Sequence, residues 1–239
     1  MIPLNYLTHY FSLKYKGDWS KIYLALINHE DQNEYLFLEK EDYEKVKAID
    51  LTDEKYPNKY KKINQPPFIL YYSTTVEWLD KKNIWLIDYE NAISNYDILT
   101  LIKAGYGFVI YYDSVVLDTL INRLISLKAR ICIITDEGIY SSKNIKYLSY
   151  CNVSVISEIP KDYNSNKITQ DLKRLACASS DHILCVNELY QIDDYLFNKY
   201  KDCQLDLVLL DKKLAKQNTI YPKYINRIYQ FIKNSKLIN

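Results

Sequence analysis

Glycine is scarce in this sequence, since the chain of 239 residues contains only four glycines. A dinucleotide fingerprint or a P-loop needs two or three glycines in one turn, because the backbone must bend sharply and approach a phosphate closely. Gly105 and Gly107 are the one close pair, and they lie between a predicted helix and the strand that follows it. That is the wrong end of a strand for a phosphate loop, so both glycine-dependent nucleotide motifs are excluded.

The sequence also lacks excess charge and long apolar runs. Its net charge is +1, so attraction to nucleic acid must come from a local patch of basic residues. No apolar run approaches the roughly 18 residues that span a bilayer. The first residues lack the basic start, continuous apolar core and cleavage site of a secretory signal. We therefore expect a soluble cytoplasmic protein that does not contact a membrane.

Cysteine and histidine are too few and too scattered for a strong site signal. The five cysteines are odd in number and lie singly in or near apolar segments, which is typical of reduced core thiols. Cys177, His182 and Cys185 do not have the spacing of a zinc site. The chain contains no G-x-S-x-G motif and no recognisable nucleophile–base pattern. We expect no catalysis, no cofactor and no resident metal.

Short apolar runs alternate with amphipathic stretches from Phe68 onward: "FILYY", "IWLID", "FVIYY", "ICIIT", "VSVIS", "HILCV" and "LDLVLLD". This alternation is typical of an α/β protein whose mainly parallel sheet is covered by helices on both faces. We predict a Rossmann-like, doubly wound sheet, with any ligand crevice at the carboxyl ends of the strands.

The chain divides into three expected parts. Residues 1–62 form a small helical N-terminal region with helices at 2–14, 19–28 and 40–48. The proline- and lysine-containing stretch "DEKYPNKYKKINQPP" marks its end, residues 63–215 form the core, and residues 216–239 are predicted to be a closing helix. The four lysines of this stretch are predicted to be a solvated linker: Lys55, Lys59, Lys61 and Lys62.

Carboxylates follow the predicted strands and form what we call the acidic rim: Asp88, Glu90, Asp113, Asp136 and Glu137. A phosphate brought to this rim would meet like charges, at a cost on the order of 4 kcal/mol per close pair at an effective dielectric constant near 20. One interpretation is that Asp88, Asp113 and Asp136 cap the helices that follow. The other is that the rim holds a divalent cation.

Five short motifs follow one another between Tyr56 and Asp211: "YPNKYKKINQPPFILYY", "VVLDTLINR", "YSSKN", "SEIP" and "LKRLACASSDHILCV". In order and spacing they resemble motifs of the DprA/Smf DNA-processing family. The resemblance implies single-stranded DNA binding, a homodimer, and loading of a RecA-type recombinase during DNA uptake or recombination. The family-motif positions that this chain retains are Asp118, Thr119, Tyr140, Asn144, Ser157, Glu158, Pro160 and Asp181.

Two turns depart from the family pattern. The family's G-S-R after its second strand is Asp88-Tyr89-Glu90 here, and its S-G-L-A-R-G turn is the segment 111–116. The candidate DNA-binding residues are therefore five other basic residues, joined by Tyr111 and Tyr112 for base stacking: Lys128, Arg130, Lys173, Arg174 and Arg123. The alternatives are an ordinary solvated face, or an interaction or regulatory module that has lost DNA and nucleotide binding.

Overall fold

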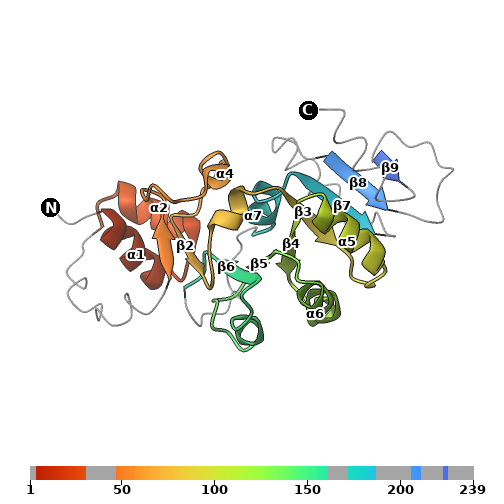
Figure 1. Ribbon diagram of the computed structural model, residues 1–239. Helices are drawn as coiled ribbons and strands as arrows, with labels where there is room; N and C mark the ends of the chain where they lie inside the picture. Colours follow the sequence, from red (N-terminus) through yellow and green to blue (C-terminus); the bar gives the residue numbers. More distant parts are fainter. Residues whose placement is uncertain (1–3, 31–46, 161–171, 187–205, 211–222, 226–239) are drawn as a thin grey trace.

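A single sheet organises the computed structural model, which describes residues 4–30, 47–160, 172–186, 206–210 and 223–225. Within these residues the sheet has nine strands in the order β1-β2-β6-β5-β4-β3-β7-β8-β9 (Figure 1). Neighbouring strands from β6 to β9 are parallel, and β2 is antiparallel to both β1 and β6. The strands are β1 (Ala48–Asp50), β2 (Ile69–Tyr72), β3 (Asn83–Ile87), β4 (Gly107–Tyr112), β5 (Ile131–Thr135), β6 (Val153–Ser157), β7 (His182–Val186), β8 (Asp206–Leu210) and β9 (Lys223–Ile225).

Helices cover both faces of this sheet, which confirms the predicted α/β fold. Alternate strand residues point to opposite faces. Ile84 and Leu86 of β3 pack into the core that includes α5 and α6, whereas Trp85 and Ile87 pack into the core that includes α7. The helical segments are α1 (Leu4–Lys14), α2 (Trp19–Ile27), α4 (Asn58–Lys61), α5 (Asn95–Lys103), α6 (Asp118–Ser126) and α7 (Lys173–Ala178), with 3-10 turns η2 (Glu77–Asp80), η3 (Val115–Leu117) and η4 (Ile145–Tyr147).

The order of the strands defines two edges of the sheet. The chain runs outward from β3 through β4 and β5 to β6, and then returns to place β7 on the other side of β3. This reversal is where the fold class places its ligand crevice, beyond the carboxyl ends of the strands. We call the segments directly after β3, β4, β5 and β6 the carboxyl edge. The segments directly before β3, β4, β5 and β7 are the amino edge.

The N-terminal helices pack beside β2 at one end of the sheet (Figure 1). The Tyr71 hydroxyl donates to Ser12 Oγ at 3.0 Å, and the Tyr71 ring meets the edge of the His9 ring at 5.9 Å. Trp19 Nε1 donates to the Pro66 carbonyl at 2.8 Å. Burial lowers the pKa of His9 to about 4. The helical region is therefore attached to the sheet by buried polar contacts.

Three expectations about the ends of the sheet need correction. The helices expected at 2–14 and 19–28 are present as α1 and α2, but the helix expected at 40–48 lies outside the described residues except for its end, where Ala48 begins β1. Strand β1 pairs with β2, so the sheet starts before residue 63. Lys223–Ile225, inside the expected closing helix, form β9 along β8. Strands β1 and β9 have three residues each, which is too short for a periodic pattern to identify them.

Candidate nucleic-acid interface

Asp88 fills the turn where the fold class normally holds a ligand anion. Its carboxylate is 1% exposed and accepts the backbone N–H groups of Ala92 at 2.8 Å and Ile93 at 2.9 Å. Asn91 has a φ of 54°, which turns the backbone so that these two N–H groups point back toward Asp88. Successive N–H groups arranged in this way are an anion-binding nest. The anion in this nest is the protein's own side chain.

Asp113 and Asp136 of the acidic rim also have side-chain partners, and neither is a helix cap, which was one of the two interpretations. Asp113 accepts the Tyr89 hydroxyl at 2.8 Å, and burial together with Asp113 raises the pKa of Tyr89 above its usual range. Asp136 pairs with Lys143 at 3.2 Å. The caps of α5 and η3 are Ser94 and Ser114, which accept the N–H groups of Asp97 and Val116. Each serine directly precedes the first turn of its helix, where its hydroxyl oxygen accepts an N–H group that has no partner within the helix.

A small pocket lies beside the rim, between the ends of β3 and β4. It has about 20 Å³ of space, whereas ligand sites usually have 300 Å³ or more. Tyr89, Tyr111 and Lys173 are among its lining residues, and Lys173 Nζ lies 5.8 Å from the centre of the Tyr111 ring. Tyr112, the other tyrosine considered for stacking, is fully buried. The pocket therefore has room for about one water molecule and not for a base.

Arg174 forms a buried ion pair and therefore does not belong to an exposed DNA-binding patch. Its Nη1 and Nη2 donate to Glu158 Oε1 and Oε2 at 2.7 and 2.6 Å, and its Nε donates to the Gln65 carbonyl at 3.0 Å. The two side chains are 9% and 4% exposed. The family-motif residue Glu158 thus serves as the counter-ion of Arg174, and the pair joins α7 to the end of β6.

Asp118, another family-motif residue, lies at the centre of a polar cluster on the carboxyl edge. It accepts hydrogen bonds from the Tyr112 hydroxyl, the Lys146 ammonium group and the Tyr147 hydroxyl, the last at 2.5 Å. Burial alone would raise the pKa of Asp118, but the hydrogen bonds from these partners hold it below its usual value. The cluster fastens the segment after β5 to the start of α6.

The other family-motif positions are mainly structural in what they contact. Asn144 is buried and donates from Nδ2 to Thr135 Oγ1 at 3.1 Å and to the Gly138 carbonyl at 3.0 Å. Ser157 accepts the Ile159 N–H at 3.0 Å. Asp181 pairs with Lys59 at 3.1 Å and accepts the Asn83 N–H at 2.7 Å. Pro160 is buried, while Thr119 and Tyr140 are exposed.

Arg130 links neighbouring segments of the amino edge by hydrogen bonds. Its Nη2 donates to the Lys82 carbonyl at 2.8 Å and to the Gly105 carbonyl at 3.4 Å, and so joins the segments that precede β3, β4 and β5. Gly107 makes room for it, because a Cβ there would lie 2.6 Å from Arg130 Nε. Arg130 is therefore a positioning residue whose guanidinium is partly buried.

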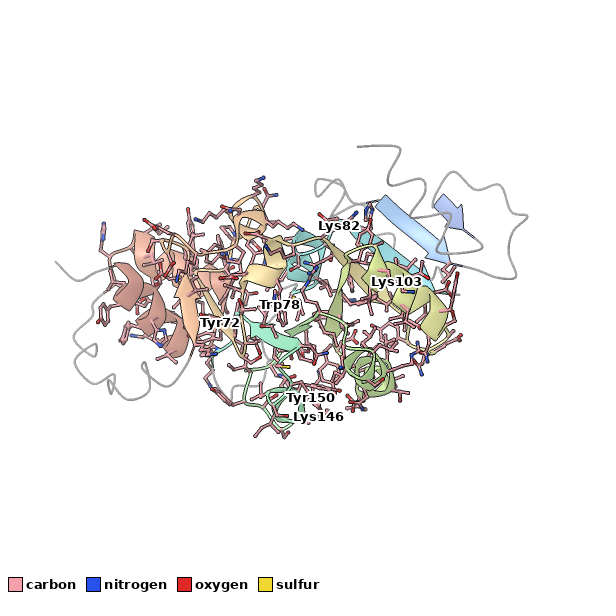
Figure 2. All side chains as sticks on the ribbon, viewed as in Figure 1. Tyr72, Trp78, Lys82, Lys103, Lys146 and Tyr150 are labelled. Atoms are coloured by element: carbon pink, nitrogen blue, oxygen red, sulfur yellow. The ribbon has the colours of Figure 1, made fainter. Side chains whose placement is uncertain are left out.

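Exposed lysines lie on the same edge of the sheet as Arg130, and only one of them, Lys128, is a candidate from the sequence alone. We call Lys81, Lys82, Lys103, Lys128 and Arg130 the amino-edge patch; its four lysines are exposed. Lys82 Nζ lies 4.3 Å from the centre of the Tyr106 ring, and Lys103 is the last residue of α5. Figure 2 shows Lys82 and Lys103 on the part of the molecule away from Lys146. Inspection of the basic residues that precede each predicted strand would have found the three missed lysines.

The five basic residues predicted from the sequence therefore do not form one patch. Lys128 and Arg130 lie on the amino edge. Lys173 lies at the pocket of the carboxyl edge, and Arg174 is buried. Arg123 donates from Nη1 to the Asn91 carbonyl at 3.4 Å, next to the Asp88 turn.

The described residues contain neither a membrane-spanning helix nor a cluster of metal-ligating side chains. No helix in the described part of the chain is long and apolar enough to cross a membrane. Among the same residues, no three His, Cys, Asp or Glu side chains gather as ligands for a metal ion.

Comparison with solved structures identifies the fold. DprA from Streptococcus pneumoniae superposes with a TM-score of 0.59 over 95% of this chain and 92% of that one, at 10% identity. DprA from Helicobacter pylori, whose structure is described for its mode of binding single-stranded DNA, gives a TM-score of 0.58 over 81% of this chain and 96% of that one, at 17% identity. No protein-family model and no curated protein matches the sequence. The likeness to DprA indicated by the motifs is confirmed at the level of the fold.

Proposed function

We propose that this protein binds single-stranded DNA in the cytoplasm as a divergent, non-enzymatic DprA-like DNA-processing protein. The observation that carries the proposal is the DprA fold over 95% of the chain, shared with a structure described for single-stranded DNA binding. The five ordered motifs and the exposed lysines support it. Lysines bind the phosphate backbone without reading the bases, so binding should tolerate different sequences.

Two further roles belong to the same proposal. By the family resemblance, the protein would form a homodimer and help to load a RecA-type recombinase on the bound strand. Exposed apolar side chains on α5 and η3 support a protein–protein contact: Tyr96, Leu99, Val115 and Val116. Light scattering at several protein concentrations would detect the dimer.

Fluorescence anisotropy of a labelled oligo-dT strand tests the binding. We expect micromolar or tighter binding that weakens as salt rises and that exceeds binding to a duplex of equal length. Absence of binding at 50 mM salt and tens of micromolar protein would overturn the proposal.

A second function is favoured by the closed carboxyl edge. Because Asp88 fills its own anion nest, the fold could serve as an interaction or regulatory module that binds a protein and no nucleic acid. The two functions predict opposite results in the anisotropy experiment.

A further inference from the structure

We infer that the single strand binds along the amino edge of the sheet, opposite to the crevice where ligands of this fold class bind. The inference rests on the proposed function and specifies the surface that performs it. It follows from how the charges and backbone donors are used at the two edges of the same sheet.

The carboxyl edge offers a phosphate little attraction. Its nest is filled by Asp88, so a phosphate would have to displace a buried carboxylate from two backbone N–H groups. Most of its cations are already paired with carboxylates: Lys143 with Asp136, Lys146 with Asp118 and Arg174 with Glu158. Glu90 and Asp113 are exposed there and would repel a phosphate.

The amino edge has the opposite balance. No residue of the amino-edge patch forms an ion pair with a carboxylate within the described part of the chain. Two carboxylates near the patch have other partners among the described residues. Asp80 accepts the N–H groups of Asn58 and Lys59, and Asp181 pairs with Lys59. The charge of the patch is therefore available to phosphates.

The patch is also held in place. Arg130 bonds to the segments before β3 and β4, and the register pairs Asn83 with Gly107 and Phe108 with Ile131, so these segments start at one level. The Tyr106 ring supports Lys82 at 4.3 Å. Lys128 has a φ of 55°, where the equivalent turn after α5 uses Gly105 with a φ of 88°. A lysine stands where a glycine would fit the backbone better.

The experiment compares two matched double variants in oligo-dT binding at several salt concentrations. Lys103→Gln with Lys128→Gln removes two charges from the amino edge, and Lys146→Gln with Lys173→Gln removes two from the carboxyl edge. Each phosphate contact with a single strand contributes about 0.7 to the slope of log K against log salt. We expect the amino-edge variant to lose about 1.4 from the slope and to bind roughly 25-fold more weakly at 0.1 M salt.

Lys128→Gly removes one charge from the patch without adding backbone strain. Glycine fits a positive φ, so this variant should unfold at the same or a higher urea concentration and still bind DNA more weakly. The inference is overturned if the carboxyl-edge variant loses the binding, and the proposed function then survives. If the wild-type protein does not bind at all, the proposed function itself fails.

Discussion

The Glu158–Arg174 pair should be the most sensitive polar contact in the described core. Its two hydrogen bonds of 2.7 and 2.6 Å join charges that are 4% and 9% exposed. Removing one partner of a buried pair leaves an uncompensated charge and costs about 3–5 kcal/mol. Glu158→Gln should therefore lower the free energy of unfolding by about 4 kcal/mol, and Tm by roughly 8–16 °C at about 2–4 °C per kcal/mol.

Urea unfolding of a double-mutant cycle measures this coupling. Replacing both partners by apolar residues, as Glu158→Leu with Arg174→Met, leaves no buried charge, so it should cost far less than the two single changes together. Lys21→Gln is the control, because Lys21 forms an ion pair with Asp18 while its side chain is 62% exposed, and it should cost less than about 1 kcal/mol. A Glu158→Gln cost below about 1 kcal/mol, or a double variant whose cost equals the sum, would refute the reasoning.

Three further predictions concern buried or clustered groups. Burial lowers the pKa of His9 to about 4, so between pH 6.5 and 4 the unfolded chain binds a proton that the folded chain does not. The free energy of unfolding of the wild-type protein should therefore fall by up to about 3 kcal/mol as the pH drops through this range. His9→Phe should make this fall smaller when both proteins are unfolded in urea at each pH. Hydrogen bonds hold the pKa of Asp118 below its usual value, so they stabilise the fold above an aspartate's usual pKa of about 3.9, and this stabilisation is lost as the pH falls below that value. Asp118→Asn should therefore make the free energy of unfolding depend less on pH in the acid range. An unchanged pH dependence would contradict this role of Asp118. Asp88→Asn replaces a charged acceptor of two N–H groups and should cost about 2 kcal/mol in urea unfolding; a neutral effect would mean that the nest does not need its carboxylate.

The core strands could be predicted from the sequence because parallel strands buried on both faces are continuous apolar runs. β2 to β8 are predicted in this way, whereas β1 and β9 are each three residues long and depend on a neighbouring strand for their hydrogen bonds. The order of β7 beside β3 follows from chain reversal and has no local signal in the residues.

The site was less predictable because its contacts join distant positions. The role of Asp88 depends on the positive φ of Asn91, and no residue pattern there requires that conformation. Arg174 and Glu158 were both recognised, but their pairing across 16 residues was not, so a buried arginine was assigned to the DNA patch. Lys82 and Lys103 are candidates because they precede β3 and β4, and the register that places the starts of β3, β4 and β5 at one level has no local signal.

Lysine footprinting of the wild-type protein, with and without an oligo-dT strand, tests most directly whether a single strand binds along the amino edge. Acetylation of each lysine is measured by mass spectrometry at equal protein concentration. We predict that the strand protects Lys82, Lys103 and Lys128 of the amino edge and leaves Lys146 and Lys173 of the carboxyl edge unchanged. Protection of Lys146 and Lys173 with no protection of the amino-edge lysines would contradict binding along the amino edge.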